Sequence, residues 1–236
     1  MRLLIRRGSG EAGKRVSLED DEIHHIKVRR ARDGDRVEVR DGAGLVAAGI
    51  LVKADREWMV EITAAEVREP PPALILGVAS GDRDRFSWMV EKAAEMGVTQ
   101  VVPLETERTA SVATRLKDTH IPRLRRSAME TLKQCGASWA TAVEEPVPLS
   151  TFVKEPVSGN RWLAHQSGAP APPSLDHTPI TVIVGPEGGL TEREVKSVTS
   201  AGYQPISVGT HTLRFETAAL ASAAAVTQAR LRGRHG

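Results

Sequence analysis

Two stretches decide the fold of this chain: TVIVGPEGGLTEREV at residues 181–195 and ISVGTHTLRFETA at residues 206–218. Each begins with a short apolar run, Thr181 to Val184 or Ile206 to Val208, that stops at a glycine and gives way to helix-forming residues. This pattern predicts two buried strands followed by glycine loops and helices. Because the N–H groups of a helix start can bind a polar or anionic group, both loops are candidate binding loops, although ordinary strand-to-helix turns explain them equally well.

The region from Ala73 onwards repeats the order of strand and helix. Thr191 and Glu194 form a T-x-x-E capping box after the GPEGG loop. The last predicted helix is rich in alanine, so it either packs closely on a sheet or meets a second copy of the chain. The further predicted strands are 74–79, 98–104, 161–165 and 204–208, and the predicted helices are 85–96, 122–135 and 218–231. Alternating strands and helices predict an α/β fold with a parallel sheet covered on both faces.

Residues 1–69 have a different pattern, which predicts a small β-rich domain. Residues 36–40 and 45–52 form a hairpin pattern around a glycine turn, and residues 18–28 form a short helix that Ser17 could cap. Short strands joined by tight turns favour a small barrel. Three consecutive prolines, residues 70–72, form a stiff linker before a second domain at residues 73–236.

Composition excludes several classes of protein. Cys135 is the single cysteine, so neither an intrachain disulfide nor a cysteine metal cluster can form, and without an HExxH motif we expect no metal site. No apolar run is long enough to span a bilayer, and the N-terminus lacks the apolar core of a signal peptide, so we expect a cytoplasmic protein without a membrane segment.

The net charge of +2 hides a local excess of basic residues. The first forty residues contain nine arginines. Residues 108–139 include only two acidic residues but seven basic ones, namely Arg108, Arg115, Lys117, Arg123, Arg125, Arg126 and Lys133. Such clusters favour a polyanionic partner, although solvated helix faces also carry arginines.

The glycine loops match none of the common nucleotide or hydrolase motifs. GPEGG has neither the G-x-G-x-x-G spacing nor a GK[ST] ending, and the chain contains no G-x-S-x-G. A classical dehydrogenase, kinase or triad hydrolase is therefore disfavoured. The remaining possibility is a ligand held by backbone groups at the carboxyl ends of parallel strands.

Taken together, five segments resemble the 16S ribosomal RNA uracil-N3 methyltransferases (RsmE), a family of the SPOUT class of S-adenosylmethionine enzymes. These segments are VGPEGGLTEREV (184–195), LRFETAALA (213–221), HHIKVRRARDGDRVEVRDGAG (24–44), VEKAAEMGVTQVVPLETERT (90–109) and LKQCG (132–136). The resemblance implies a PUA-like RNA-binding barrel at residues 1–69 and a SPOUT domain with a trefoil knot at residues 73–236. It also implies S-adenosyl-L-methionine as cofactor, 16S rRNA or the small ribosomal subunit as substrate, and a homodimer. Two alternatives remain open: a SPOUT methyltransferase acting on tRNA or another rRNA position, and a non-catalytic RNA-binding assembly protein.

The resemblance also implies roles for individual residues. Arg214 would orient or stabilise the uracil or a phosphate, and Glu216 would either accept a proton or serve as an acid at a helix start. Glu187 would either be a polar residue of the site, in contact with the cofactor or in place of Glu216, or hold its loop in shape. Where the family carries an arginine after the helix end, this chain has Ala137. If that arginine helps to place the RNA or the cofactor, Arg108 or Arg126 would do so here. The residues expected to bind the cofactor are Ala164, His165, Gln166, Gly185, Glu187, Gly188, Gly189, Ser207, Val208, Gly209, Thr212 and Leu213. The residues expected to bind RNA are Arg6, His24, His25, Arg29, Arg30, Arg108 and Arg126.

Overall fold

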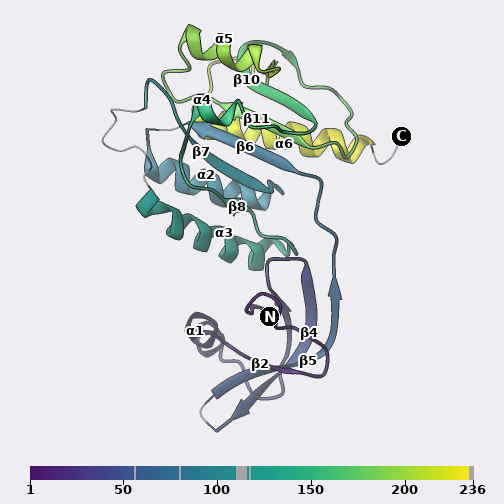
Figure 1. Cartoon of the computed structure of the whole chain (residues 1–236). Helices are drawn as coiled ribbons and strands as arrows, with labels where there is room; N and C mark the ends of the chain where they lie inside the picture. Colours follow the sequence, from purple (N-terminus) through teal and green to yellow (C-terminus); the bar gives the residue numbers. More distant parts are fainter. Residues whose placement is uncertain (56, 80, 110–115, 117, 234–236) are drawn as a thin grey trace. The chain divides into compact units, whose positions relative to one another are not determined.

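The computed structural model describes residues 1–55, 57–79, 81–109, 116 and 118–233 (Figure 1). Arg115 and Lys117 of the basic segment lie outside these residues. Contacts divide the chain into two units: Met1–Pro71 with Met129–Ala140, and Pro72–Ala128 with Thr141–Gly236. The proline linker coincides with the end of Met1–Pro71, whereas nothing in the sequence indicated that residues 129–140 belong with the first unit.

The first unit contains a five-stranded sheet with the order β1-β3-β4-β5-β2. Its elements are β1 (Arg2–Leu4), β2 (Arg15–Ser17), α1 (Asp20–Val28), β3 (Arg36–Arg40), β4 (Leu45–Ala54) and β5 (Glu57–Val67). β1 runs parallel to β3, and the other pairs are antiparallel. The predicted hairpin is confirmed. The predicted cap is wrong, because Ser17 belongs to β2 and the N-cap of α1 is Glu19, which makes no side-chain cap bond.

The second unit contains a parallel sheet with the order β12-β10-β11-β6-β7-β8, which confirms the predicted α/β class. Its strands are β6 (Leu74–Ala79), β7 (Gln100–Glu105), β8 (Ala142–Val143), β9 (Val147–Pro148), which also pairs with β7, β10 (Asn160–Pro170), β11 (Ile180–Val184) and β12 (Gln204–Ser207). Its helical elements are α2 (Arg83–Glu95), η1 (Asp118–His120), α3 (Ile121–Cys135), whose end belongs to the first unit, α4 (Leu149–Phe152), α5 (Glu192–Ser200) and α6 (Phe215–Gly233).

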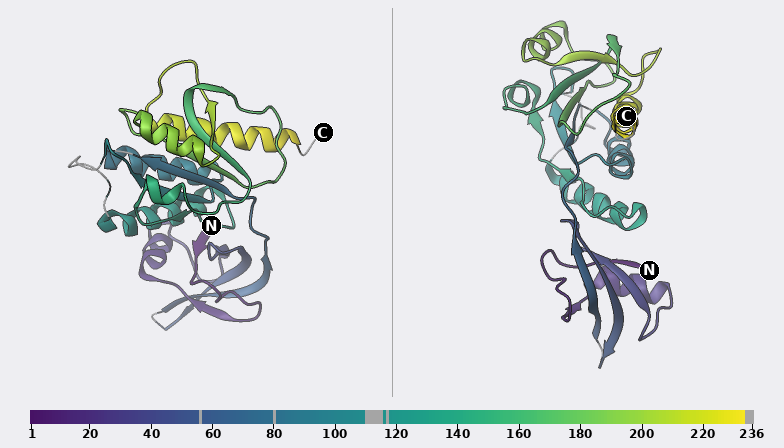
Figure 2. Two further views of the ribbon diagram at one scale, coloured as in Figure 1. Left: turned by 45° about the horizontal axis from the view of Figure 1, so that its top comes forward. Right: turned by 90° about the vertical axis from the view of Figure 1, so that its right-hand side faces the viewer.

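Helices cover both faces of this sheet (Figure 2). In the right-hand view, α2 in blue and α6 in yellow lie on one face, and α4 and α5 in green lie on the other. Alternate residues of β11 serve the two faces: Val182 packs in the cluster of α2 and α6, and Ile183 packs in the cluster of α4 and α5. All five residues of β11 are buried, as the continuous apolar run predicted.

Three alanines of α6 are buried where the helix packs on the sheet. Ala219, Ala223 and Ala229 are buried, and the helix contacts α2, β6, β10 and β11. Small side chains let its backbone approach the sheet closely, so packing on the sheet accounts for one face of this helix. The predicted capping box of α5 is confirmed, because Thr191 accepts from the Glu194 N–H and the Glu194 carboxylate accepts from the Thr191 N–H.

The strand order places three carboxyl ends side by side. β10 lies between β11 and β12, and all three are parallel, so their carboxyl ends meet at one edge of the sheet. Near this edge β10 bulges, because Ala164 and Ala169 both pair with Ile206. The trefoil knot stays a prediction.

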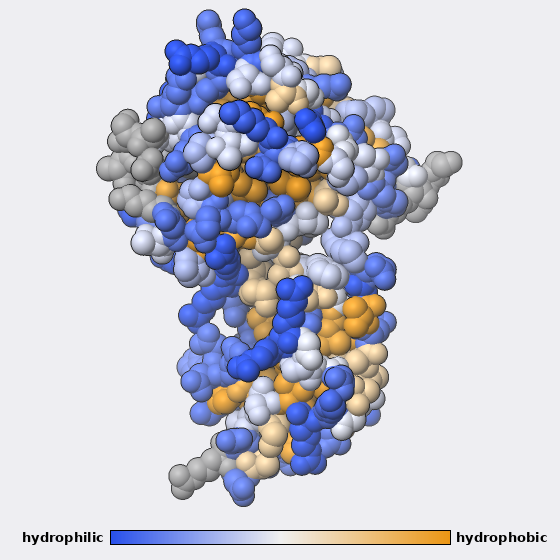
Figure 3. Space-filling model, in the orientation of Figure 1, coloured by the Kyte–Doolittle hydropathy of each residue, from blue (hydrophilic) through white to orange (hydrophobic). Residues whose placement is uncertain are grey.

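The surface is mostly hydrophilic on the face drawn in Figure 3. Among the described residues, the large apolar side chains that are exposed are Met1, Val28, Val67, Trp88 and Leu231. No helix within the described ranges is long and apolar enough to cross a membrane.

Candidate functional site

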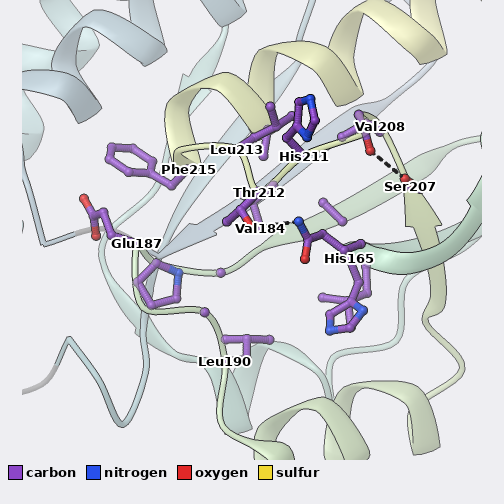
Figure 4. Close-up of a pocket in the computed structure, with 18 residues that line it drawn as sticks. His165, Val184, Glu187, Leu190, Ser207, Val208, His211, Thr212, Leu213 and Phe215 are labelled. Carbon is purple, nitrogen blue, oxygen red and sulfur yellow. Dashed lines mark hydrogen bonds between the residues drawn. The ribbon is translucent and has the colours of Figure 1, made fainter.

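A cavity of about 210 Å³ lies where β10, β11 and β12 end (Figure 4). Eleven of the twelve residues expected to bind the cofactor line it; Gly188 is the exception. Two further lining residues, Pro186 and His211, fall inside the predicted loops 185–189 and 207–213. Five lining residues were not predicted: Leu163, Val184, Leu190, Phe215 and Ala218. Several of these could have been found as the apolar neighbours of the predicted loops. That the lining residues contact a cofactor stays a prediction.

The bulge of β10 supplies one wall of the cavity. The Gln166 Nε2 donates to Thr212 Oγ1 at 2.7 Å, so the bulge is tied to the loop after β12 (Figure 4). Gly168 makes the bulge possible, because a Cβ atom there would lie 2.4 Å from the backbone nitrogen of Ile206. The His165 Nδ1 lies 2.8 Å from Ser167 Oγ within the same bulge.

The GPEGG loop forms the second wall. Gly189 has a φ of +73°, which favours glycine, and its N–H donates to the Pro186 carbonyl at 2.8 Å. The Glu187 carboxylate accepts from the N–H of Gly81 at 3.4 Å, which ties this loop to the residues after β6. This contact fits the second role predicted for Glu187, holding the loop in shape.

The loop after β12 forms the third wall and leads into α6. The Ser207 hydroxyl donates to the Gly209 carbonyl at 3.0 Å, which tightens the turn (Figure 4). Leu213 and Phe215 line the cavity with apolar surface, and Thr212 adds a hydroxyl. The complete lining therefore combines apolar walls with a few polar groups, as binding sites for small molecules commonly do.

The two residues predicted to be catalytic lie at the start of α6 but do not line the cavity. Arg214 is exposed, and no hydrogen bond or ion pair joins its side chain to another described residue. Glu216 is buried in the first turn of α6, and its Oε1 lies 3.9 Å from Arg85 Nη1 on α2. The other oxygen of Glu216, Oε2, is buried and has no hydrogen-bond partner among the described residues, so both roles given to Glu216 stay predictions.

The residues expected to bind RNA fall into separate groups. His25 and Arg29 line a groove of about 930 Å³ in the first unit, whose other charged lining residues are Arg2, Asp35, Arg36, Glu38, Glu130 and Lys133. Arg6, His24 and Arg30 are exposed in the same unit but do not line the groove. Arg126 is exposed on α3, and Arg108 follows β7, where its guanidinium donates to the Gly188 carbonyl.

The three acids that line the groove already have partners: Asp35 accepts from the Arg32 N–H, Glu130 pairs with Lys133, and Glu38 pairs with two arginines. The Glu38 carboxylate accepts from Arg2 Nε at 2.9 Å and from Arg40 Nη2 at 2.9 Å. Partial burial alone would raise the pKa of Glu38, but the hydrogen bonds and charges of Arg40 and Arg2 outweigh it and hold the pKa below its ordinary value. Arg29 and Arg36 make no ion pair with a described residue, so the groove offers unpaired positive charge.

Lys133 joins α1 to the end of α3 at this groove. Its Nζ lies 2.7 Å from both Glu22 Oε1 and Glu130 Oε2. Burial by itself would lower the pKa of Lys133, but its bonds to Glu130 and Glu22 raise it above the ordinary value.

The position of the absent family arginine lies beside the same network. The carbonyls of Gly136 and Ala137 each accept from Arg40 Nη1 at 2.7 Å, and the Arg40 side chain is buried. Residues 136 and 137 therefore serve as an anchor for Arg40 inside the first unit. Across the described ranges, no group of three or more His, Cys, Asp or Glu residues could hold a metal ion.

Comparisons with known proteins agree with this geometry. Residues 68–227 match the family model of the RNA methyltransferase domain, and residues 18–57 match that of the RNA methyltransferase PUA domain. Ribosomal RNA small subunit methyltransferase E of Synechocystis sp. is 30% identical over 86% of this chain and 69% of that protein. The protein of the same name from Rickettsia conorii is 27% identical over 99% of this chain and 96% of that protein.

A solved structure extends the likeness to the fold. Ribosomal RNA small subunit methyltransferase E of Neisseria gonorrhoeae, crystallised with S-adenosyl methionine, is 26% identical, covers 95% of both chains and superimposes with a TM-score of 0.82. These findings confirm the resemblance seen in the sequence. The chain therefore belongs to the family of the ribosomal RNA small subunit methyltransferases E, with an RNA methyltransferase domain and a PUA domain.

Proposed function

We propose that this protein is an S-adenosyl-L-methionine-dependent methyltransferase that methylates N3 of a uridine in 16S rRNA of the small ribosomal subunit. The observation that carries the proposal is the cavity at the ends of β10, β11 and β12, which gathers residues from all three predicted loops. The names of the Synechocystis and Rickettsia relatives supply the substrate class, and the Neisseria structure supplies the cofactor.

The lining fits a cofactor that combines a flat aromatic base with polar ribose and amino-acid groups. Leu190, Leu213 and Phe215 offer apolar surface, and Ser207 and Thr212 offer hydroxyls. Backbone groups of the glycine loops add donors and acceptors. When bound, the cofactor supplies a methyl group already activated by its sulfonium charge, so the remaining task of the protein is alignment of the acceptor.

The acceptor determines what the RNA side of the site must do. Uracil N3 lies on the Watson–Crick edge, so the base has to be unpaired or extruded before it can react. The N3 proton must also leave, because a neutral imide nitrogen is a poor nucleophile. We assign Arg214 to the developing negative charge on the base, since its exposed guanidinium stands at the loop that lines the cavity. Glu216, engaged with Arg85, would fix the start of α6.

A methylation assay tests this assignment. The protein, S-adenosyl-L-methionine and either 16S rRNA or small subunits that lack the modification are incubated, and N3-methyluridine is measured by mass spectrometry. We expect Arg214→Met to lower the turnover about a hundredfold while the cofactor affinity changes less than about twofold. Arg232→Met, an exposed arginine at the far end of α6, is the matched control.

Two results would overturn parts of the proposal. If the wild-type protein binds the cofactor and methylates tRNA instead of either ribosomal substrate, the substrate is wrong. If it binds no cofactor at all, the activity is wrong and an RNA-binding assembly role takes its place.

We also propose that the protein acts as a homodimer in the cytoplasm, where its substrate is found. The support is the family resemblance together with a second face of α6 that the sheet leaves partly exposed. Sedimentation analysis should give twice the chain mass of 25.5 kDa. A sedimenting species with the mass of one chain would contradict the dimer.

A further inference from the structure

Arg108 is exposed and its contact with RNA stays a prediction, but its side chain also bonds within the protein. Its guanidinium donates to the carbonyl of Gly188, and the same Nη1 lies 3.4 Å from the carbonyl of Gly189. Its stem lies close to the loop, because a Cβ atom added to Gly188 would lie 3.3 Å from Arg108 Cδ. One side chain from the end of β7 therefore bridges two consecutive peptide groups of the GPEGG loop.

A second bond ties the same two elements. The N–H of Glu107, next to Arg108 in the chain, donates to Glu194 Oε1 at 2.8 Å. The other oxygen of this buried carboxylate accepts from the Thr191 N–H, also at 2.8 Å. The residues after β7 therefore hold the GPEGG loop at its glycines, through Arg108, and at its exit, through Glu194.

The turn that carries Arg108 is closed by hydrogen bonds. Thr106 and Thr109 are both buried, the Thr106 N–H donates to Thr109 Oγ1 at 2.9 Å, and the Thr109 N–H donates to the Thr106 carbonyl at 3.1 Å. A closed turn of this kind keeps the arginine between its two ends in place. The loop that it holds contains three glycines, and a glycine-rich segment would otherwise lose much conformational entropy when a ligand orders it.

We propose that Arg108 is a positioning residue for the cofactor site: it holds the GPEGG loop in its binding conformation before the cofactor arrives. The inference rests on the proposed function, because it assigns the cavity to S-adenosyl-L-methionine. Gly185, Glu187 and Gly189 of this loop line the cavity, whereas Arg108 does not. Arg108 therefore acts on the cofactor through the loop, and its loss weakens cofactor binding in the absence of RNA. A guanidinium suits the task because its planar fork can bond to several acceptors at once.

Calorimetric titration of the full-length protein with S-adenosyl-L-methionine, without RNA, tests the proposal. We expect Arg108→Met to raise the Kd about tenfold, the loss expected for a hydrogen bond from a charged donor. Arg108→Lys should recover part of the affinity, because an ammonium can bond to one carbonyl but lacks the fork. The matched control is Arg193→Met, which removes an equal charge from an 88% exposed side chain that lies 3.7 Å from Glu107.

A parallel measurement of RNA affinity without cofactor separates positioning from RNA contact. Unchanged RNA affinity in Arg108→Met, together with weaker cofactor binding, supports the proposal. Cofactor affinity within about twofold of wild type, together with weaker RNA binding, overturns it.

Amide hydrogen exchange tests the positioning of the loop even if the proposed methyltransferase function is wrong. A wild-type protein that binds no cofactor would overturn the proposed function. In that event, faster exchange at residues 185–190 in Arg108→Met than in the wild-type protein would still support positioning of the loop, and equal exchange would overturn it.

Discussion

The cavity of the second unit and the groove of the first are built by opposite means. Glu187 is the one lining residue of the cavity with a formal charge among the described residues, and the cavity takes its shape from glycine turns, a strand bulge and hydroxyl bonds. The groove has seven charged side chains among its eleven lining residues. A site shaped by the backbone should respond to steric changes, whereas a site made of side-chain charge should respond to salt and pH.

The largest effect should come from adding one methyl group to the bulge of β10. In Gly168→Ala the new Cβ would lie 2.4 Å from the Ile206 nitrogen and 2.5 Å from the carbonyl carbon of Pro205, so β10 and β12 must separate. We expect the free energy of unfolding to fall by about 3 kcal/mol and the cofactor Kd to rise at least about tenfold. Urea denaturation and calorimetry measure the two effects.

Gly97→Ala is the matched control for this variant. Gly97 has a φ of +79° but no atom within 4 Å of an added Cβ, so its replacement tests backbone strain without a clash. A loss of about 1 kcal/mol with unchanged cofactor affinity is expected. If Gly168→Ala behaves like Gly97→Ala, the bulge is not what shapes the cavity.

Removing charge from the groove should have a smaller effect, confined to RNA. The double variant Arg29→Met with Arg36→Met removes two cations that have no acidic partner among the described residues. We expect RNA affinity to fall about tenfold at low salt and the salt slope of binding to fall by about 1 to 2, because each phosphate contact releases counterions. Cofactor affinity should not change.

A control with the same change in net charge makes the comparison sharper. Lys14→Met with Arg15→Met also removes two cations from the first unit, but these are paired with Glu11 and Glu61 outside the groove. An equal loss of RNA affinity in both double variants would mean that general charge, and not the groove, attracts RNA.

The sequence predicted the cavity better than the groove, and the reason is the range of the interactions. The cavity follows local signals: a buried strand, a glycine and a helix start lie within a few residues, and parallel strands bring such loops to one edge. The bulge that Gly168 permits was missed, because its cause is the backbone of β12, about forty residues away in the chain. The groove depends on residues 129–140 joining the first unit, which no local pattern encodes.

Arg108 and Glu216 show the same limit from another side. A sequence gives the charge of a residue but not the direction of its side chain. The sequence therefore predicts an RNA contact for Arg108 but not the bond of its guanidinium to the GPEGG loop. It offers two roles for Glu216 but does not reveal that Arg85 lies 3.9 Å away.

The smallest effect should be a pH dependence at the wall of the groove. The pKa of Glu38 is held below its ordinary value by Arg40 and Arg2, so the bonded carboxylate stabilises the first unit above the unfolded pKa of about 4.3. This contribution is lost as the pH falls through the lower folded pKa. We expect Glu38→Gln to reduce the free energy of unfolding by about 1 kcal/mol at pH 7, a small figure because water screens a carboxylate whose side chain is 40% exposed.

The difference between wild type and Glu38→Gln should therefore shrink as the pH falls below the unfolded pKa of about 4.3, and urea denaturation at decreasing pH measures it. Glu66→Gln, which removes an exposed partner of Arg68, should leave the free energy of unfolding at pH 7 nearly unchanged. Arg40 should stay in place in the Glu38→Gln variant, so the measurement reports the loss of the carboxylate charge. Its guanidinium is buried and keeps the carbonyls of Gly136 and Ala137 as acceptors when the carboxylate is gone. If the difference in the free energy of unfolding stays constant down to pH 3, Glu38 stabilises the unit through its shape and not through its charge. The groove would then depend on steric fit, as the cavity does.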